Sequence, residues 1–114
     1  MKLFGLKNCD TCKKALRALK EAGRAPDFHD VRVDGVTKAY LSKWAKAAGW
    51  ETLLNTRSTT WRGLSDNDKS DVDEKKAIAL MEAHPALIKR PVIENGPTQV
   101  FVGWTKDVQD ALLK

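Results

Sequence analysis

The chain has 114 residues, a formal net charge of +5 and two cysteines, and 42% of its residues are hydrophobic and 31% charged. These values are typical of one soluble domain and exclude a disulfide-stapled scaffold; without a bilayer-spanning run or a secretory leader, we expect a cytoplasmic protein with no membrane partner. Because basic and acidic residues are interleaved, the charge indicates a mildly basic surface that attracts small anions rather than a direct nucleic-acid interface.

The N-terminal third predicts a strand, a helix and a second strand. The strands are expected over residues 3–6 and 27–33, and the helix over residues 10–22, where apolar positions recur at helical spacing. Gly23 and Pro26 follow the helix as its stop signals. A strand–helix–strand unit of this length implies a parallel pair of strands joined by a crossover helix.

A mostly helical insertion is expected next, over about residues 35–84. Thr37 is the expected cap of one helix, which Gly49 ends, and Asp73 is the expected cap of a later helix. Residues 50–71, between these two helices, have a less regular pattern.

The C-terminal part predicts an antiparallel hairpin and a last helix. The hairpin strands are expected over residues 87–93 and 99–102, around the turn signal Asn95-Gly96-Pro97, and Thr105 is the expected cap of the helix. The element order then gives one α/β domain over residues 1–114. It has a thioredoxin-like fold, a mixed sheet flanked by helices, with the helical insertion between an N-terminal βαβ unit and a C-terminal ββα unit.

Both cysteines lie at the junction of the first strand and the first helix, in the run KNCDTC of residues 7–12. Unpaired backbone N–H groups and the positive end of the helix dipole favour an anion there. The thiolate is that anion and the nucleophilic form, so Cys9 is the predicted nucleophile with a lowered pKa. The alternative is that Cys9 is only a small buried residue at a tight turn.

Several neighbours of Cys9 are expected to act on its thiolate. The ammonium groups of Lys7, Lys13 and Lys14 favour the thiolate, whereas the adjacent Asp10 opposes it. The Thr11 hydroxyl is placed to donate a hydrogen bond to the sulfur.

Cys12 has two possible roles. It is either a resolving thiol, which attacks a mixed disulfide formed at Cys9, or a small apolar residue packed on the helix face with Leu16. A zinc site needs four ligands, and His29 and His84 are the histidines of the chain, so no metal is expected.

Three arginines are candidates for anion binding. Arg90 directly precedes Pro91, and a cis-proline at this point of a thioredoxin fold lies beside the redox cysteine, so Arg90 is expected to bind a carboxylate or oxyanion there. The alternative is a surface arginine before an ordinary trans proline. Arg57 and Arg62 lie in a Thr/Ser-rich loop that either binds an anion or is simply solvated.

Four segments, in this order along the chain, resemble the YffB branch of the ArsC/Spx family: Lys7–Ala15, Asp27–Asp30, Asn55–Arg62 and Ile88–Val92. The resemblance covers essentially the whole chain. It implies a thioredoxin-like fold with a helical insertion, a single essential cysteine matching Cys9, and an arginine before a cis-proline.

The resemblance also bears on the substrate, because arsenate reductases of this family hold the oxyanion with three arginines. Arg90 matches the first of them. The second falls close to Arg57, but in register it falls on Asn55, and the third falls on residues 102–104, which contain no arginine. Arsenate reduction is therefore less expected than reduction of a thiol substrate.

The sequence thus predicts a glutathione-dependent thiol–disulfide oxidoreductase, arsenate reductase-like, with Cys9 as nucleophile. The further catalytic candidates are Cys12, Thr11 and Arg90, and the residues assigned to binding glutathione or another small thiol or disulfide are Lys7, Asn8, Arg57, Arg62, Arg90 and Pro91. The alternative is a Spx-like regulator, a class that binds RNA polymerase, in which a Cys9–Cys12 disulfide acts as a redox switch.

Overall fold

The protein is described here by a computed structural model that covers residues 1–96 and 98–113. The chain forms two compact units. The first combines Met1–Asp34 with Arg90–Lys114, and the second is Gly35–Lys89. Within the part of the chain that the structure describes, no helix is long and apolar enough to cross a membrane.

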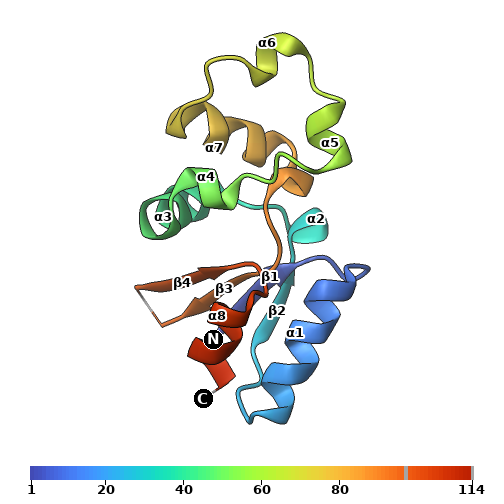
Figure 1. Ribbon diagram of the computed structural model, residues 1–114, viewed down its shortest axis with the longest axis vertical. Helices are drawn as coiled ribbons and strands as arrows, with labels where there is room; N and C mark the ends of the chain where they lie inside the picture. The colour runs from blue at the N-terminus through green and yellow to red at the C-terminus, as the bar shows by residue number, and fades with distance from the viewer. Residues whose placement is uncertain (97, 114) are drawn as a thin grey trace. The chain divides into compact units, whose positions relative to one another are not determined.

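The first unit is a four-stranded sheet in the order β2-β1-β3-β4, with helices α1, α2 and α8 (Figure 1). Strand β1 pairs in parallel with β2 and antiparallel with β3, and β3 pairs antiparallel with β4, so the predicted mixed sheet is confirmed. The bounds are β1 Lys2–Gly5, α1 Asp10–Glu21, β2 Asp27–Asp30, α2 Val31–Asp34, β3 Val92–Asn95, β4 Gln99–Val102 and α8 Lys106–Leu113.

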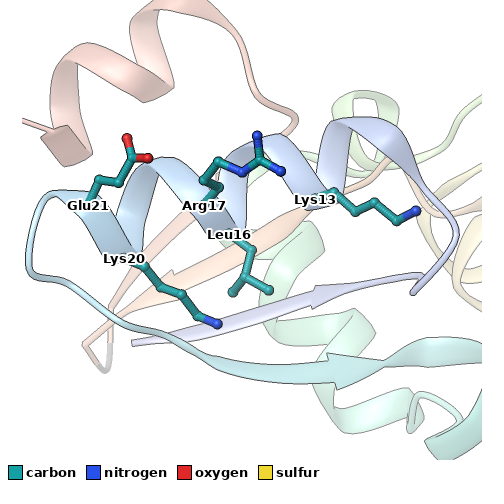
Figure 2. Close-up of a pocket in the computed structure, with 5 residues that line it drawn as sticks. All are labelled: Lys13, Leu16, Arg17, Lys20 and Glu21. Carbon is teal, nitrogen blue, oxygen red and sulfur yellow. The ribbon is translucent and has the colours of Figure 1, made fainter.

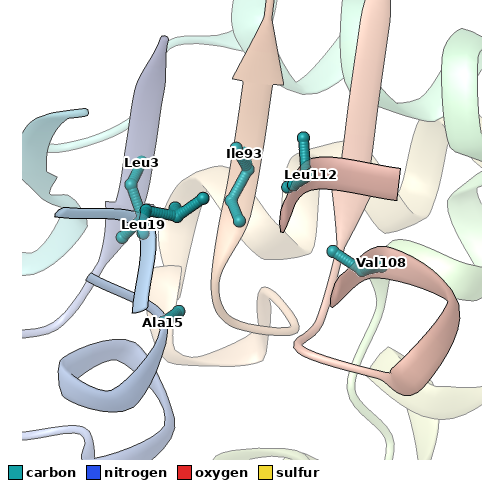
Figure 3. Packing of buried hydrophobic residues seen from close by; sticks show 6 residues of the cluster. All are labelled: Leu3, Ala15, Leu19, Ile93, Val108 and Leu112. Carbon is teal, nitrogen blue, oxygen red and sulfur yellow. The ribbon is translucent and has the colours of Figure 1, made fainter. Parts of the chain in front are cut away.

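One face of this sheet packs against α1 and α8. Leu3 of β1 stands opposite Ile93 of β3, and both are fully buried. They form a cluster with Ala15 and Leu19 of α1 and with Leu112 of α8 (Figure 3). Burial of a large aliphatic side chain contributes about 1.5–3 kcal/mol, so this cluster fixes α1, and the thiol at its start, against the sheet.

Strand β2 is shorter than predicted. It ends at Asp30, whereas the sequence pattern extended it to residue 33. The Asp30 carboxylate accepts hydrogen bonds from the backbone N–H groups of Arg32 and Val33, at 2.9 and 3.2 Å. These bonds turn the chain into α2, because an Asp side chain competes with the sheet for nearby N–H groups.

The strand predicted over residues 87–93 begins later, at Val92. Pro85–Leu87 form a 3-10 turn, and the Arg90–Pro91 peptide bond is cis. The carbonyl of Pro91 accepts the N–H of Gly103 at 2.8 Å, which joins it to the end of β4. Strand β3 also ends later than predicted, because Asn95 pairs with Gln99. The second strand, β4, has the predicted bounds, and Pro97 of the turn lies outside the described residues.

The second unit is helical, with α3 Lys38–Ala48, α4 Trp50–Leu53, α5 Thr59–Arg62, α6 Asp66–Lys69, α7 Glu74–Ala83 and the 3-10 turn η1 Pro85–Leu87. The predicted caps are confirmed: Thr37 accepts the N–H of Tyr40 at 3.4 Å, and Asp73 accepts the N–H of Lys76 at 2.8 Å. The stretch expected to be irregular holds three one-turn helices, of which α5 and α6 have their first N–H groups capped by Ser58 and Ser65, whereas α4 follows Gly49 without a side-chain cap.

Candidate active site

Cys9 is the N-cap residue of α1, at the start of twelve helical residues. Its N–H donates to the carbonyl of Leu6 at 3.2 Å, and its carbonyl accepts the N–H of Lys13 at 3.0 Å, so its backbone closes the turn from β1 into the helix. The side chain makes no capping hydrogen bond of ordinary geometry. The sulfur therefore lies at the positive end of a long helix whose first N–H groups are not taken by a stronger acceptor.

The pKa of Cys9 is lowered. Partial burial raises it, but this effect is outweighed by the backbone N–H and the thiol of Cys12, by the positive charge of Arg90, and by the backbone N–H of Thr11. The nucleophile predicted from sequence thus has the environment that a thiolate needs. Arg90 supplies a charge that favours the thiolate, and Thr11 contributes its N–H. The effects predicted for the lysines of the motif and for the Thr11 hydroxyl stay predictions.

Cys12 has the opposite environment. It lies on the buried face of α1, 1% exposed, and burial raises its pKa to about 12. This pKa is the net result: after burial, the largest effect is the Leu6 N–H, which lowers it, the hydrogen bond to Cys9 and the negative charge there raise it, and the charge of Arg90 lowers it. Both cysteines are free thiols. Cys9 is therefore stabilised as a thiolate, while Cys12 keeps its proton and donates a hydrogen bond to the Cys9 sulfur.

Gly5 makes room for the Cys12 sulfur. A Cβ atom at Gly5 would lie 2.5 Å from Sγ of Cys12, closer than real contacts allow. The last residue of β1 must therefore lack a side chain for α1 to pack this tightly. The sequence analysis missed this residue, although a glycine at the end of a strand signals a close approach of another element.

Asp30 is a second residue that the sequence analysis did not assign to the site. It is 8% exposed, and its Oδ2 accepts the N–H of Lys7 at 3.1 Å while Oδ1 binds the start of α2. Burial raises the pKa of Asp30, but these N–H groups and the charge of Lys7 lower it overall. Asp30 thus ties the loop that precedes Cys9 to the end of β2, and an aspartate at a strand end is the signal that could have shown it.

Arg90 and Pro91 belong to the same unit as Cys9. Of the two alternatives from the sequence, the structure has the cis peptide bond before Pro91. Pro91 is buried, and Arg90 is half-buried and near enough for its charge to lower the pKa of both thiols. Lys7 and Asn8 are exposed in the loop between β1 and α1. The roles predicted for these four residues in binding a molecule at Cys9 stay predictions.

Arg57 and Arg62 lie in the second unit, so their assignment to substrate binding stays a prediction. The backbone of their loop is satisfied internally: Asn55 Oδ1 accepts the N–H of Arg57, and Ser58 Oγ accepts the N–H of Trp61, both at 3.1 Å. Any anion binding there depends on the two exposed guanidinium groups. Among the described residues, no group of His, Cys, Asp and Glu could hold a metal ion.

Comparisons with known proteins match nearly the whole chain. The sequence profile of the ArsC family matches residues 4–112. The solved structure of the YFFB protein is 45% identical, with a TM-score of 0.90, and covers 98% of this chain and 97% of its own. An arsenate reductase (ArsC) related protein from Brucella melitensis is 38% identical, with a TM-score of 0.75, over 100% of this chain and 96% of its own.

A relative of a different kind is the global transcriptional regulator Spx of Streptococcus mutans. It is 26% identical over 113 residues, which cover 97% of this chain and 81% of the regulator. Together, these similarities confirm the predicted thioredoxin-like fold and the ArsC/Spx resemblance.

Proposed function

The chain belongs to the ArsC family, and on that premise we propose that it is a glutathione-dependent thiol–disulfide oxidoreductase with Cys9 as its nucleophile. The observation that supports this most is the opposite tuning of the two thiols: the pKa of Cys9 is lowered and that of Cys12 is raised to about 12. Disulfide exchange requires a nucleophilic thiolate, and a neighbouring thiol that keeps its proton supports that thiolate as a hydrogen-bond donor.

In the first step, the Cys9 thiolate attacks the glutathione sulfur of a mixed disulfide between glutathione and a substrate thiol. A bond forms between the two sulfurs as the original disulfide bond breaks, and the substrate leaves as a thiolate that takes a proton from water. In the second step, the thiolate of free glutathione attacks the glutathione now bound to Cys9. Glutathione disulfide forms, and Cys9 leaves as a thiolate, which its lowered pKa favours.

Cys12 acts in this scheme as a hydrogen-bond donor to the Cys9 sulfur rather than as a resolving thiol. With a pKa of about 12, only about one Cys12 in 10⁵ is a thiolate at pH 7. Formation of a bond to Cys9 removes the negative charge that raises the pKa of Cys12, but burial, the largest cause, remains. Free glutathione therefore resolves the intermediate more readily than Cys12 does.

Arg90 is the proposed binding residue for a carboxylate of glutathione. Its charge acts on Cys9, and a guanidinium group forms paired, charge-assisted hydrogen bonds with a carboxylate. Arg57 or Arg62 is the proposed second cation, and Lys7, Asn8, Thr11 and Pro91 complete the proposed surface around the thiol. Arsenate is the less favoured substrate, because residues 102–104 are Val, Gly and Trp where the third arginine of that reaction is expected.

The test is consumption of NADPH in an assay coupled to glutathione and glutathione reductase, with the mixed disulfide of glutathione and free cysteine as substrate. Wild type and Cys12→Ser should turn it over, and Cys9→Ser should not. Arsenate as substrate should give much slower turnover. An inactive wild type whose Cys9 still reacts with iodoacetamide would overturn the proposal.

A second candidate is a Spx-like redox regulator, which the match to the Streptococcus mutans protein over 113 residues favours. In that case, a disulfide between Cys9 and Cys12 would change a binding surface instead of supporting turnover. Oxidised and reduced protein should then bind purified RNA polymerase differently, and equal or absent binding would exclude this candidate.

A further inference from the structure

A groove follows the exposed side of α1 toward the loop before Cys9. It consists of three adjoining hollows of about 370, 180 and 230 Å³ in the first unit. The first lies on α1 alone (Figure 2) and shares Lys13 and Leu16 with the second. The second shares Leu6 and Lys7 with the third, so the three form one surface, here called the α1 groove.

The floor of the α1 groove is apolar and its rim is positively charged. Leu6, Leu16 and Phe28 are half-buried and form apolar parts of its lining. Around them stand five exposed cations, which are Lys7, Lys13, Arg17, Lys20 and Arg32.

The negative charges of the groove do not cancel this potential. Two acidic residues line it, Glu21 and Asp30. Asp30 is buried, and its carboxylate is taken up by three backbone N–H groups. Glu21 stands in the last turn of α1 (Figure 2), away from the cysteine end. The surface is thus complementary to an anionic partner with some apolar side chains.

The groove is too long for a small thiol. From Lys13 to Glu21, α1 rises about 12 Å, and this is the length of about four residues of extended polypeptide. The other two hollows extend the surface past Cys12, which lines the middle one, to Lys7 and Asn8 beside the nucleophile. Glutathione, a tripeptide, would leave much of this surface unused.

We propose that the α1 groove binds an acidic segment of a protein substrate and thereby presents that protein's mixed disulfide with glutathione to Cys9. This inference rests on the proposed function and names its substrate class. The overall reaction consumes one free glutathione and yields the reduced protein thiol and one glutathione disulfide. Arg17 and Lys20 take no part in the chemistry, so they act on specificity alone.

The test uses two synthetic peptides of equal length, each with one cysteine in a mixed disulfide with glutathione. In one, Asp, Glu and Leu flank the cysteine, and in the other, Lys replaces the acidic residues. The measured quantity is kcat/KM in the coupled assay, for wild type and for the double variant Arg17→Glu/Lys20→Glu. Lys38→Glu/Lys75→Glu is the matched control, since it makes the same charge change at exposed positions of the second unit.

At low salt, wild type and the control should prefer the acidic peptide by about tenfold, and the groove variant should lose this preference. All three should act equally on the mixed disulfide of glutathione and cysteine, which reports the proposed function alone. Equal kcat/KM for the two peptides on wild type, or an equal loss in the control, would overturn the inference.

If the mixed disulfide of glutathione and cysteine is not turned over, the proposed function fails. Peptide binding then tests the α1 groove independently of turnover. The same peptides with serine in place of cysteine, carrying a fluorophore, then give the Kd by anisotropy. Tighter binding of the acidic peptide that Arg17→Glu/Lys20→Glu abolishes would support the groove as a docking surface. Equal Kd values for both peptides would refute it.

Discussion

The N-termini of α5 and α1 both follow a turn with polar residues, but they differ in whether a capping side chain accepts their first N–H groups. Helix α5 is capped by Ser58, whose hydroxyl accepts the N–H of Trp61, and Asn55 takes the N–H of Arg57. Helix α1 is capped by Cys9, whose side chain makes no ordinary capping bond. At α5 the cap accepts backbone N–H groups, whereas at α1 the first N–H groups stay available to stabilise the Cys9 thiolate.

The two helices also differ in what holds them. Helix α1 has twelve residues, and Cys12, Ala15 and Leu19 bury one of its faces. Helix α5 has four residues and no buried side chain. The positive end of a helix acts on a neighbouring group through the unpaired N–H groups of its first turn, and the packing of α1 holds those groups beside Cys9. The comparison indicates that a turn with nearby basic residues forms an anion site where the following helix is packed and its first backbone N–H groups are not bonded to a capping side chain.

The largest expected effect is at the α1 terminus itself. Cys9→Ser replaces the thiolate by a hydroxyl that does not ionise at pH 7, so turnover in the coupled assay should fall at least about 10³-fold. Ser58→Ala, the matching change at α5, should leave turnover unchanged and lower the free energy of unfolding by about 1 kcal/mol in a denaturant titration. Comparable losses of turnover in both variants would erase the distinction between the two termini.

Asp30→Asn should sharpen the comparison, because Asp30 holds the loop before Cys9. The pKa of Asp30 is lowered in the folded state, so its contribution is present above the ordinary Asp pKa of about 4 and is lost as pH falls below it. At pH 7, the variant should unfold with a free energy about 1–3 kcal/mol lower than wild type, measured by urea titration. Between pH 5 and 3, wild type should lose stability more steeply than the variant; parallel curves would contradict the assignment.

Arg90→Ala should weaken both binding and thiolate formation. The KM for the glutathione mixed disulfide should rise about tenfold, the equivalent of about 1.4 kcal/mol and within the range of one charge-assisted hydrogen bond. Because the charge of Arg90 lowers the pKa of Cys9, the midpoint of the pH dependence of Cys9 alkylation should move upward. Arg90→Lys should restore the midpoint but only part of the KM, and an unchanged midpoint in Arg90→Ala would argue against a role at the thiol.

The smallest effect is expected at the α5 loop. Arg57→Ala and Arg62→Ala remove exposed charges, and the hydrogen bonds that hold the loop do not involve these side chains. Because exposed charges interact weakly, the KM should rise by only about two- to fivefold in one of the two variants. The pH midpoint of Cys9 alkylation should be the same as in wild type. No change of KM in either single variant or in the double variant would remove both arginines from the proposed binding surface.

Features that depend on neighbours in sequence were predicted best. The caps Thr37, Asp73 and Thr105 and the C-terminal stop Gly23 are local signals, and each occurs as expected. The parallel pairing of β1 with β2 and the antiparallel pairing of β3 with β4 were predicted from the element order, since crossover and hairpin connections restrict the topologies.

The features that were missed depend on residues far apart in the chain. Asp30 binds the N–H of Lys7 across 23 positions, and Gly5 makes room for the sulfur of Cys12 in another element. The charge of Arg90, 81 positions after Cys9, lowers the pKa of the thiol, and the position of Arg90 beside it depends on the fold rather than on neighbours in sequence. Contacts of this kind depend on how distant elements pack together, and local sequence patterns do not predict that packing.

The central claim is that Cys9 alone forms the covalent intermediate with glutathione, and trapping that intermediate tests it most directly. Wild type and Cys12→Ser would be mixed with excess glutathione–cysteine disulfide, quenched in acid within one turnover and mapped by mass spectrometry. Glutathione should be found on the peptide that contains Cys9 in both proteins. Glutathione on Cys12, or a Cys9–Cys12 disulfide that replaces the adduct in wild type as fast as it forms, would contradict it.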